Sequence, residues 1–242
     1  MQRLTIPIAL LAAVLMSGPA AGESWDCGQS TAYSPRFIIE TDLCDSARTA
    51  IAAESIVVDT IWSPSSIKKH PLGQRVALLS LPIARAFAQR FYIEAVDRSS
   101  GIGVMAGVTA DPGRMAAVTG TVANVEGEIV LLPGLPEDVT LGELGDAPKP
   151  LGMSSTALRL GIGADPTGIL ARVWGKAVSV PQGETYYLVS DGGPSTGSGC
   201  TFTVLPEGVP RPDEGADVIL TGIPGVATVG GQQVRVFRVN AQ

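Results

Sequence analysis

Residues 113–120 read Gly-Arg-Met-Ala-Ala-Val-Thr-Gly, and residues 215–222 read Gly-Ala-Asp-Val-Ile-Leu-Thr-Gly. In both stretches a glycine precedes a second glycine by seven residues, and an aliphatic residue and a threonine stand before the second glycine. Aliphatic and β-branched residues between turn-forming glycines are typical of a short β-strand. The two stretches therefore predict the same strand in two copies of one unit.

Other β-prone runs surround each copy in the same order. In the first unit the runs are Val76–Leu81, Arg90–Val96, Ile102–Ala106, Met115–Val122 and Glu128–Leu132, and we expect a core that includes Val76, Leu78, Ile93, Val104, Val118 and Ile129. In the second unit they are Ala171–Val180, Thr185–Ser190, Cys200–Val204, Ala216–Gly222 and Gln233–Val239. Phe91-Tyr92-Ile93 in the first unit matches Tyr186-Tyr187-Leu188 in the second. The 29 glycines and 18 prolines suit such short strands joined by turns better than a helix bundle.

Five short strands with an aromatic second strand and a glycine-bounded fourth strand resemble the OB-fold, a five-stranded Greek-key barrel. The run from Phe91 to Ile102, followed by Val118-Thr119-Gly120, looks like the tandem OB-like units of exported bacterial proteins of unknown function. This resemblance implies a mostly β protein with two tandem five-stranded OB-like barrels, at residues 66–133 and 169–242, joined by a connector at 134–168. An OB-fold usually has a helix after its third strand. Here the glycine- and proline-rich stretches 107–113 and 205–215 occupy that place, so we expect loops instead.

The first 22 residues have the three parts of a signal peptide: a base at Arg3, an apolar run from Leu4 to Met16, and the small residues Ala20-Ala21-Gly22. The apolar run is about 13 residues long, whereas a membrane-spanning helix needs roughly 20. We therefore expect a secreted or periplasmic protein with no transmembrane segment in the mature chain. The alternatives are a retained N-terminal anchor or a buried helix.

Residues 23–65 are predicted to form a small N-terminal extension, because they are too few to bury a core of their own. In an oxidising compartment Cys27 and Cys44 are expected to form a disulfide. It would close a loop of about 18 residues and stabilise the segment by roughly 3 kcal/mol. The alternative is two reduced, buried thiols. The third cysteine, Cys200, is expected to be a small buried hydrophobic residue.

The sequence predicts no catalytic site, no metal site and no cofactor, and hence no enzyme. His70 is the only histidine, which excludes a site built from several histidines. Ser65-Ser66-Ile67-Lys68 has the Ser-x-x-Lys spacing of penicillin-binding enzymes, but the companion Ser-Asp-Asn and Lys-Thr-Gly motifs are absent. We interpret this stretch as a solvated loop at the entrance to the first barrel.

Binding is the stronger expectation. OB-folds that bind single strands stack bases on exposed aromatic residues of the second and third strands, and arginines contact the phosphates. The candidate binding residues are Phe91, Tyr92, Arg75, Arg90, Arg98, Tyr186 and Tyr187. Strand alternation would expose one ring of each aromatic pair and bury the other, although the outward ring could simply cover the barrel. Trp174, in the first strand of the second unit, is expected in the core.

The favoured function is an exported, non-catalytic binding or interaction module for a protein, glycan or envelope partner, with the ligand itself unspecified. The alternative is a binder of single-stranded nucleic acid or another polyanion that acts through barrel 1, where residues 66–133 carry seven bases and five acids. Without its first 22 residues the chain has 16 basic and 23 acidic side chains, a net charge of −7. That charge disfavours the alternative, because affinity for a phosphate backbone grows with the number of phosphates neutralised.

Overall fold

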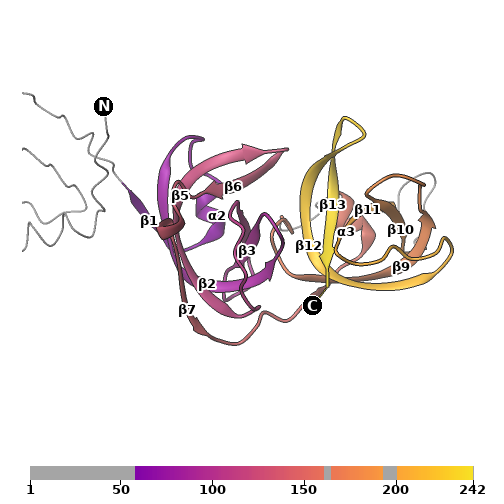
Figure 1. Ribbon diagram of the computed structural model, residues 1–242, viewed down its shortest axis with the longest axis horizontal. Helices are drawn as coiled ribbons and strands as arrows, with labels where there is room; N and C mark the ends of the chain where they lie inside the picture. Colours follow the sequence, from indigo (N-terminus) through magenta and orange to yellow (C-terminus); the bar gives the residue numbers. More distant parts are fainter. Residues whose placement is uncertain (1–57, 161–164, 193–200, 242) are drawn as a thin grey trace, which may run out of the picture. The chain divides into compact units, whose positions relative to one another are not determined.

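The computed structural model describes residues 58–160, 165–192 and 201–241, and most of these residues lie in β-strands (Figure 1). The predicted signal peptide, the predicted Cys27–Cys44 disulfide and Cys200 lie outside the described residues. Among the residues that the structure describes, no helix is both long enough and apolar enough to cross a membrane.

Barrel 1 is a closed ring of five strands. The strands are β2 (Arg75–Ala86), β3 (Phe91–Glu94), β4 (Gly101–Val104), β5 (Arg114–Val125) and β6 (Glu128–Leu132). They pair in the order β2-β3-β4-β6-β5, and an antiparallel pairing of β5 with β2 closes the ring. Only β4 and β6 are parallel among these pairs. With the fourth strand beside the first and the third beside the fifth, this is the Greek-key order of an OB-fold.

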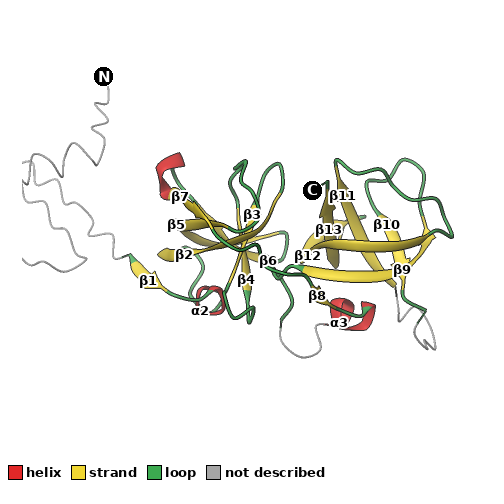
Figure 2. Ribbon diagram, turned by 90° about the horizontal axis from the view of Figure 1, so that it is seen from below, coloured by secondary structure: helices red, strands yellow, loops and turns green. Residues whose placement is uncertain are grey.

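Barrel 2 repeats this topology. Its strands are β9 (Ala171–Ser179), β10 (Tyr187–Ser190), β11 (Thr201–Glu207), β12 (Asp217–Val229) and β13 (Gln232–Asn240). They pair in the order β9-β10-β11-β13-β12, β12 closes the ring on β9, and β11 and β13 are parallel. Figure 2 shows the two sets of strands and the loops between them. The mostly β fold of two tandem OB-like barrels is therefore confirmed.

The predicted match between the fourth strands is confirmed residue by residue. In barrel 1, β2 pairs with β5 through Val76 and Gly120, and in barrel 2, β9 pairs with β12 through Ala171 and Gly222. The two glycines have a packing reason. A Cβ on Gly120 would lie 3.1 Å from the backbone of Leu132, and one on Gly222 would lie 2.1 Å from the carbonyl oxygen of Arg238. The backbone of the fifth strand thus leaves no room for a Cβ at Gly222 and only a tight fit at Gly120.

The predicted match between the aromatic pairs is off by one residue. Phe91 pairs with Val104 on the next strand, and Tyr187 pairs with Val204 in the same position of barrel 2. Phe91 therefore corresponds to Tyr187 and not to Tyr186. The reason is that β10 begins at Tyr187, so that Tyr186 belongs to the loop before it.

The fourth and fifth strands of both barrels are joined by the same two-residue turn. Glu126 and Gly127 have φ values of +56° and +91°, and Gly230 and Gly231 have +57° and +80°. Positive φ at both central residues is typical of a type I′ hairpin, whose twist matches that of the flanking strands. This shared turn fixes the register of each hairpin.

Further elements flank the barrels. They are β1 (Asp59–Ile61), α2 (Pro64–Ile67), η1 (Pro136–Asp138), β7 (Val139–Leu144), β8 (Leu151–Gly152) and α3 (Ser155–Leu160). β1 pairs with β2, and β7 pairs with β5. The sheet of barrel 1 therefore includes one strand that precedes residues 66–133 in the sequence and one that follows them. The connections β4–β5 and β11–β12 contain no helix, as expected, although β11 itself continues to Glu207.

Each barrel has its own core. Val76, Leu78, Ile93, Val104 and Val118 are buried in barrel 1 as predicted, and Ile129 packs against them half-buried. The core of barrel 2 contains Val173, Tyr187, Val189, Phe202, Val204 and Phe237. A third cluster consists of Ala84, Phe87 and Tyr92 from barrel 1 with Leu170 and Ile223. It forms an apolar contact between the two barrels, which lie in one compact unit, Val57–Gln242.

Candidate binding surfaces

A buried carboxylate of barrel 1 binds the backbone of barrel 2 directly before its first strand, β9. Glu94, at the end of β3, is fully buried. One carboxylate oxygen accepts a hydrogen bond from the Leu170 backbone N–H at 2.9 Å, and the other accepts one from Arg98 Nε at 2.9 Å. Arg98 Nη2 in turn donates to the Leu170 carbonyl oxygen at 3.1 Å. Both polar groups of the Leu170 backbone are therefore bound by barrel 1.

A second connection involves the end of β13. Arg85 on β2 donates from Nε to the side-chain oxygen of Asn240 and from Nη2 to its backbone carbonyl oxygen, both at 2.5 Å. Asn240 Nδ2 donates to the carbonyl oxygen of Ala86, also at 2.5 Å. Arg85 is buried, so its charge depends on these acceptors for the hydrogen bonds that water would otherwise supply.

Glu128 is a second buried acid, and it makes a third connection between the barrels. Its Oε2 lies 3.9 Å from Arg90, 3.8 Å from Arg238, 3.4 Å from the Tyr92 hydroxyl and 3.3 Å from the backbone N–H of Val226. Its Oε1 is buried without a hydrogen-bond partner among the described residues. Burial raises the pKa of Glu128, and the two arginines counteract this only in part because the ion pairs are long.

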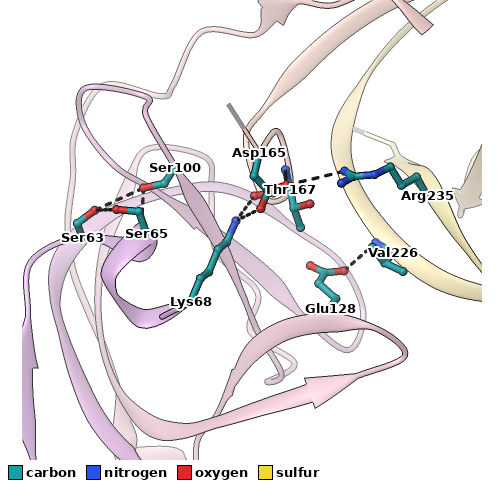
Figure 3. A network of polar contacts seen from close by, with 9 residues as sticks. All are labelled: Ser63, Ser65, Lys68, Ser100, Glu128, Asp165, Thr167, Val226 and Arg235. Carbon is teal, nitrogen blue, oxygen red and sulfur yellow. Dashed lines mark hydrogen bonds and ion pairs between the residues drawn. The ribbon is translucent and has the colours of Figure 1, made fainter. Parts of the chain in front are cut away.

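A cleft of about 190 Å³ opens beside Glu128 (Figure 3). On its wall, Lys68 Nζ donates to Asp165 and to the Thr167 carbonyl oxygen, both at 2.9 Å, and Arg235 lies 3.8 Å from Asp165. Burial by itself would raise the pKa of Asp165, but Lys68 and the hydrogen bonds from Thr167 hold it below its usual value. The cations and carboxylates of this cleft are thus largely paired with one another.

The serine and lysine of the Ser-x-x-Lys stretch have separate partners. The Ser65 hydroxyl lies 2.9 Å from that of Ser63, whereas Lys68 binds Asp165 and Thr167 (Figure 3). His70 contacts Gln74 at 3.0 Å. Across residues 58–160, 165–192 and 201–241, no three His, Cys, Asp or Glu side chains group as metal ligands would.

The expectation that one ring of Phe91 and Tyr92 is exposed is wrong. Phe91 packs into the core of barrel 1, as strand alternation requires of one of the two. Tyr92 points to the other face of β3, but there it contacts Phe87 edge to face at 5.8 Å between ring centroids and packs with Leu170 and Ile223. The outer face of β3 is covered by barrel 2, so neither ring is available for stacking.

The three arginines predicted to contact phosphates are engaged with acids. Arg75 bonds to Asp138 at 2.6 Å, and Arg90 and Arg98 take part in the Glu128 and Glu94 contacts. Of the second aromatic pair, Tyr187 is buried in the core of barrel 2, where burial raises its pKa to about 12, and Tyr186 is half-buried. The structure therefore does not bring the predicted binding residues together on one open face.

A hollow of about 410 Å³ lies beside the β4–β5 loop of barrel 1, which takes the place of the helix usual in OB-folds. Residues of the β4–β5 loop and of the connection after β6 line it: Met105, Ala106, Gly107, Val108, Pro133, Gly134, Leu135, Pro136, Val139 and Leu141. No charged side chain and no hydroxyl is among them. The hollow therefore has no charged or hydroxyl side chain to orient a small ligand.

The outer face of β9 and β12 exposes large apolar side chains. Trp174 is 63 % exposed, and Ile219, its partner across the strands, is 76 % exposed. The expectation that Trp174 lies in the core is therefore wrong. Polar pairs flank them: Arg172 donates to the Thr221 hydroxyl at 3.2 Å, and Lys176 forms an ion pair with Asp217 at 2.9 Å. We call these six residues the Trp174 face.

The sequence contained a signal for the Trp174 face. Alternate residues of a strand share one side of the sheet, and Trp174 has the same parity as Arg172 and Lys176, which are charged and exposed. Val173 and Ala177 have the opposite parity and are buried. Alternation by itself therefore places the indole outside, whereas its size and apolar character suggested the core.

No protein-family model and no curated protein matches this chain. Among solved structures, one described as a murine DNA-binding protein bound with double-stranded DNA is 12 % identical, with a TM-score of 0.34, over 65 % of this chain and 92 % of that one. The p204 HINb domain is also 12 % identical, with a TM-score of 0.32, over 71 % of this chain and 94 % of that one. Likeness at this level carries no argument about function. We assign the tandem OB-like fold from strand order and register.

Proposed function

We propose that this chain is an exported, non-catalytic binding module whose two barrels act as one body and whose contact surface is the Trp174 face. The observation that carries the proposal is the exposed Trp174–Ile219 pair between two polar pairs. Export is supported by the signal-peptide pattern of residues 1–22. The absence of catalysis rests on the single histidine and on the missing companions of the Ser-x-x-Lys stretch.

The Trp174 face has the composition of an interaction surface. When a partner buries an exposed apolar side chain, the complex is stabilised by roughly 25 cal/mol for each Å² of apolar surface removed from water. Tryptophan and arginine are the residues most enriched among those that dominate binding energies, and such residues typically lie inside a polar rim. On this face the apolar pair is central, and Arg172, Lys176, Asp217 and Thr221 surround it.

The burial and ion pairs of the residues predicted for it do not favour the nucleic-acid alternative through barrel 1. It required an outward aromatic ring on β3 with Arg75, Arg90 and Arg98 along the same groove. Both rings are buried, and each arginine contacts an acid. An arginine that already neutralises a carboxylate adds little to the release of counterions from a phosphate backbone.

Site-specific photo-crosslinking tests the proposal. A photoreactive residue replaces Ile219 in the full chain, and a matched control replaces Val96, which is 75 % exposed on barrel 1. After expression in the producing cell and irradiation, we expect adducts at position 219 that are absent at position 96. The Trp174→Ala substitution should remove them. Equal adducts at the two positions, or none at 219, would contradict the proposal.

A further inference from the structure

Barrel 1 shows what occupies the free edge of a fourth strand in this fold. The first half of β5 pairs with β2 on one side, and β6 pairs only with its second half, from Thr121 onward. β7 takes the vacant place beside β5 (Figure 1). It runs antiparallel to β5, with Ala117 opposite Thr140. The backbone groups of this edge are therefore satisfied by an added strand.

Barrel 2 has the same edge without the added strand. The first half of β12, Asp217 to Thr221, pairs with β9, and β13 pairs with β12 only from Ile223 onward. Among the described residues, no strand pairs with the other edge of Asp217–Thr221. This edge borders the Trp174 face, because Ile219 belongs to both.

The open edge has little protection against an incoming strand. Exposed edges usually carry lysine, proline or an inward charge that prevents pairing with another chain. Residues 217–221 read Asp-Val-Ile-Leu-Thr, with one charge and no proline. Three of the five, Val218, Ile219 and Thr221, are of β-prone types, and Ile219 is largely exposed. An edge of this composition favours addition of a strand.

We infer that the edge of β12 from Asp217 to Thr221 binds an extended segment of a partner protein, which adds as an antiparallel strand in the way that β7 adds to β5. This inference rests on the proposed function and specifies its partner. Backbone hydrogen bonds supply affinity in this mode of recognition, and alternate side chains supply specificity.

The register predicts which side chains the segment carries on the Trp174 face. The residue opposite Ile219 is apolar, since it lies beside the exposed side chain of Ile219 and continues the apolar row that begins at Trp174. The residue two positions before it lies opposite Thr221 and is acidic. There it meets Arg172, whose guanidinium reaches Thr221 on β12 and makes no ion pair among the described residues. The segment therefore reads acidic-x-apolar from its N-terminus.

Selection from a random nonapeptide library displayed on phage, with the full chain as target, tests the inference. We expect the selected peptides to share the acidic-x-apolar spacing. Binding should weaken roughly ten-fold or more with Ile219→Lys, which places a charge on the edge, and should be unchanged with Val96→Lys. With Arg172→Glu, the selection should shift to a basic residue at the first position.

Two measurements separate strand addition from other binding. N-methylation of a selected peptide should abolish binding at alternate residues only, because every second backbone N–H faces β12. Hydrogen exchange of Asp217–Thr221 should slow when peptide binds, while the equivalent Met115–Thr119 of β5 should not change. A failure to enrich peptides, N-methyl effects without alternation, or protection elsewhere would overturn the inference.

Other occupants give distinct results. If the photoreactive residue at position 219 crosslinks to material that a glycosidase or nuclease removes and a protease does not, the proposal of a binding module is supported and the inference of strand addition is overturned. If sedimentation shows dimers that Ile219→Lys dissociates, the occupant is a second copy of this chain, which also overturns the inference. If position 219 gives no adduct, the proposed function itself fails.

Discussion

The two barrels share strand order, hairpin turns and fourth-strand glycines, yet they differ on the outer face of the first and fourth strands. In barrel 1 this face carries Leu79 and Ala117, both half-buried, and β7 pairs with the fourth strand there. In barrel 2 the residues at the equivalent places, counted from the paired positions of the two strands, are Trp174 and Ile219, both mostly exposed. Apolar side chains beside the covered edge are thus partly shielded from water, whereas those beside the open edge are not.

This difference indicates a division of roles between two units of one topology. The strands of barrel 1 are occupied by its own chain and by the contacts with barrel 2 through Glu94, Arg85 and Glu128. The Trp174 face of barrel 2 has no such cover among the described residues. Because the shared topology does not dictate this contrast, substitutions at equivalent positions of the two barrels can test it.

The largest effect is expected for Glu94→Ala. It leaves the Arg98 guanidinium and the Leu170 N–H without their acceptor at a buried site, so the free energy of unfolding should fall by about 3 kcal/mol or more. The equivalent last residue of the second strand in barrel 2 is Ser190, and Ser190→Ala should cost less than about 1 kcal/mol. Urea denaturation measures both. Equal losses would mean that Glu94 is not a specific connection between the barrels.

The next effect concerns the paired glycines. Gly222→Ala would place a Cβ 2.1 Å from the Arg238 carbonyl oxygen, whereas Gly120→Ala meets the Leu132 backbone at 3.1 Å. Overpacking typically costs about 1 to 3 kcal/mol, and we expect the first variant to reach or exceed that range and the second to lie near its lower end. Thermal unfolding of the two variants compares them. A larger loss at Gly120 would show that the fifth strand of barrel 1 approaches its glycine more closely than that of barrel 2.

A smaller, pH-dependent effect is expected at Glu128, which is the first residue after the hairpin turn of barrel 1, as the exposed Gln232 is in barrel 2. Burial raises the pKa of Glu128, so the folded protein holds this proton up to a higher pH than the unfolded chain does. As the pH falls from the raised pKa of folded Glu128 toward the ordinary pKa of the unfolded chain, Glu128 becomes protonated in the folded protein, and the cost of burying its negative charge disappears. Wild-type stability should therefore rise relative to Glu128→Gln in that interval.

The measurement is the midpoint of urea denaturation of wild type and of Glu128→Gln. It is made at several pH values from neutral down to about pH 4.5, close to the ordinary pKa of a glutamate. The groups that face Glu128 are Arg90, Tyr92 and Arg238, and only the carboxylate changes its charge in this range. Glu137→Gln, on the exposed η1, controls for the change in net charge. A stability difference that moves in the opposite direction on acidification would contradict the raised pKa.

The smallest effect on stability is expected for Trp174→Ala, even though tryptophan is the largest side chain. Because the indole is mostly in water, the free energy of unfolding should change by no more than about 0.5 kcal/mol. Tyr187→Ala, in the core of the same barrel, should cost about 3 kcal/mol or more. Both values come from urea denaturation. A loss comparable to that of Tyr187→Ala would show that Trp174 is a structural residue and would remove the main support for the Trp174 face.

The strands of both barrels could be predicted from the sequence because their pattern is local. Glycines and prolines mark the turns, and apolar residues of one parity mark the inner face, as at Val76, Leu78 and Val118. Register was harder to predict. The glycine-bounded fourth strands aligned correctly because close backbone approach requires glycine in both, whereas the Tyr186-Tyr187 pair offered two rings of equal character and was matched one residue too early.

The candidate site could not be read from the same pattern, since alternation tells which residues share a face and not what covers that face. Tyr92 and Trp174 both stand on the outer side of a strand. Tyr92 is buried because Leu170 and Ile223 of the second half of the chain pack on it, and Trp174 is exposed because no described segment reaches it. The sequence by itself determined two five-strand barrels and their inner faces. Only the tertiary structure decided which outer faces are covered, because that depends on contacts between residues about 80 to 130 positions apart along the chain, to which local periodicity does not respond.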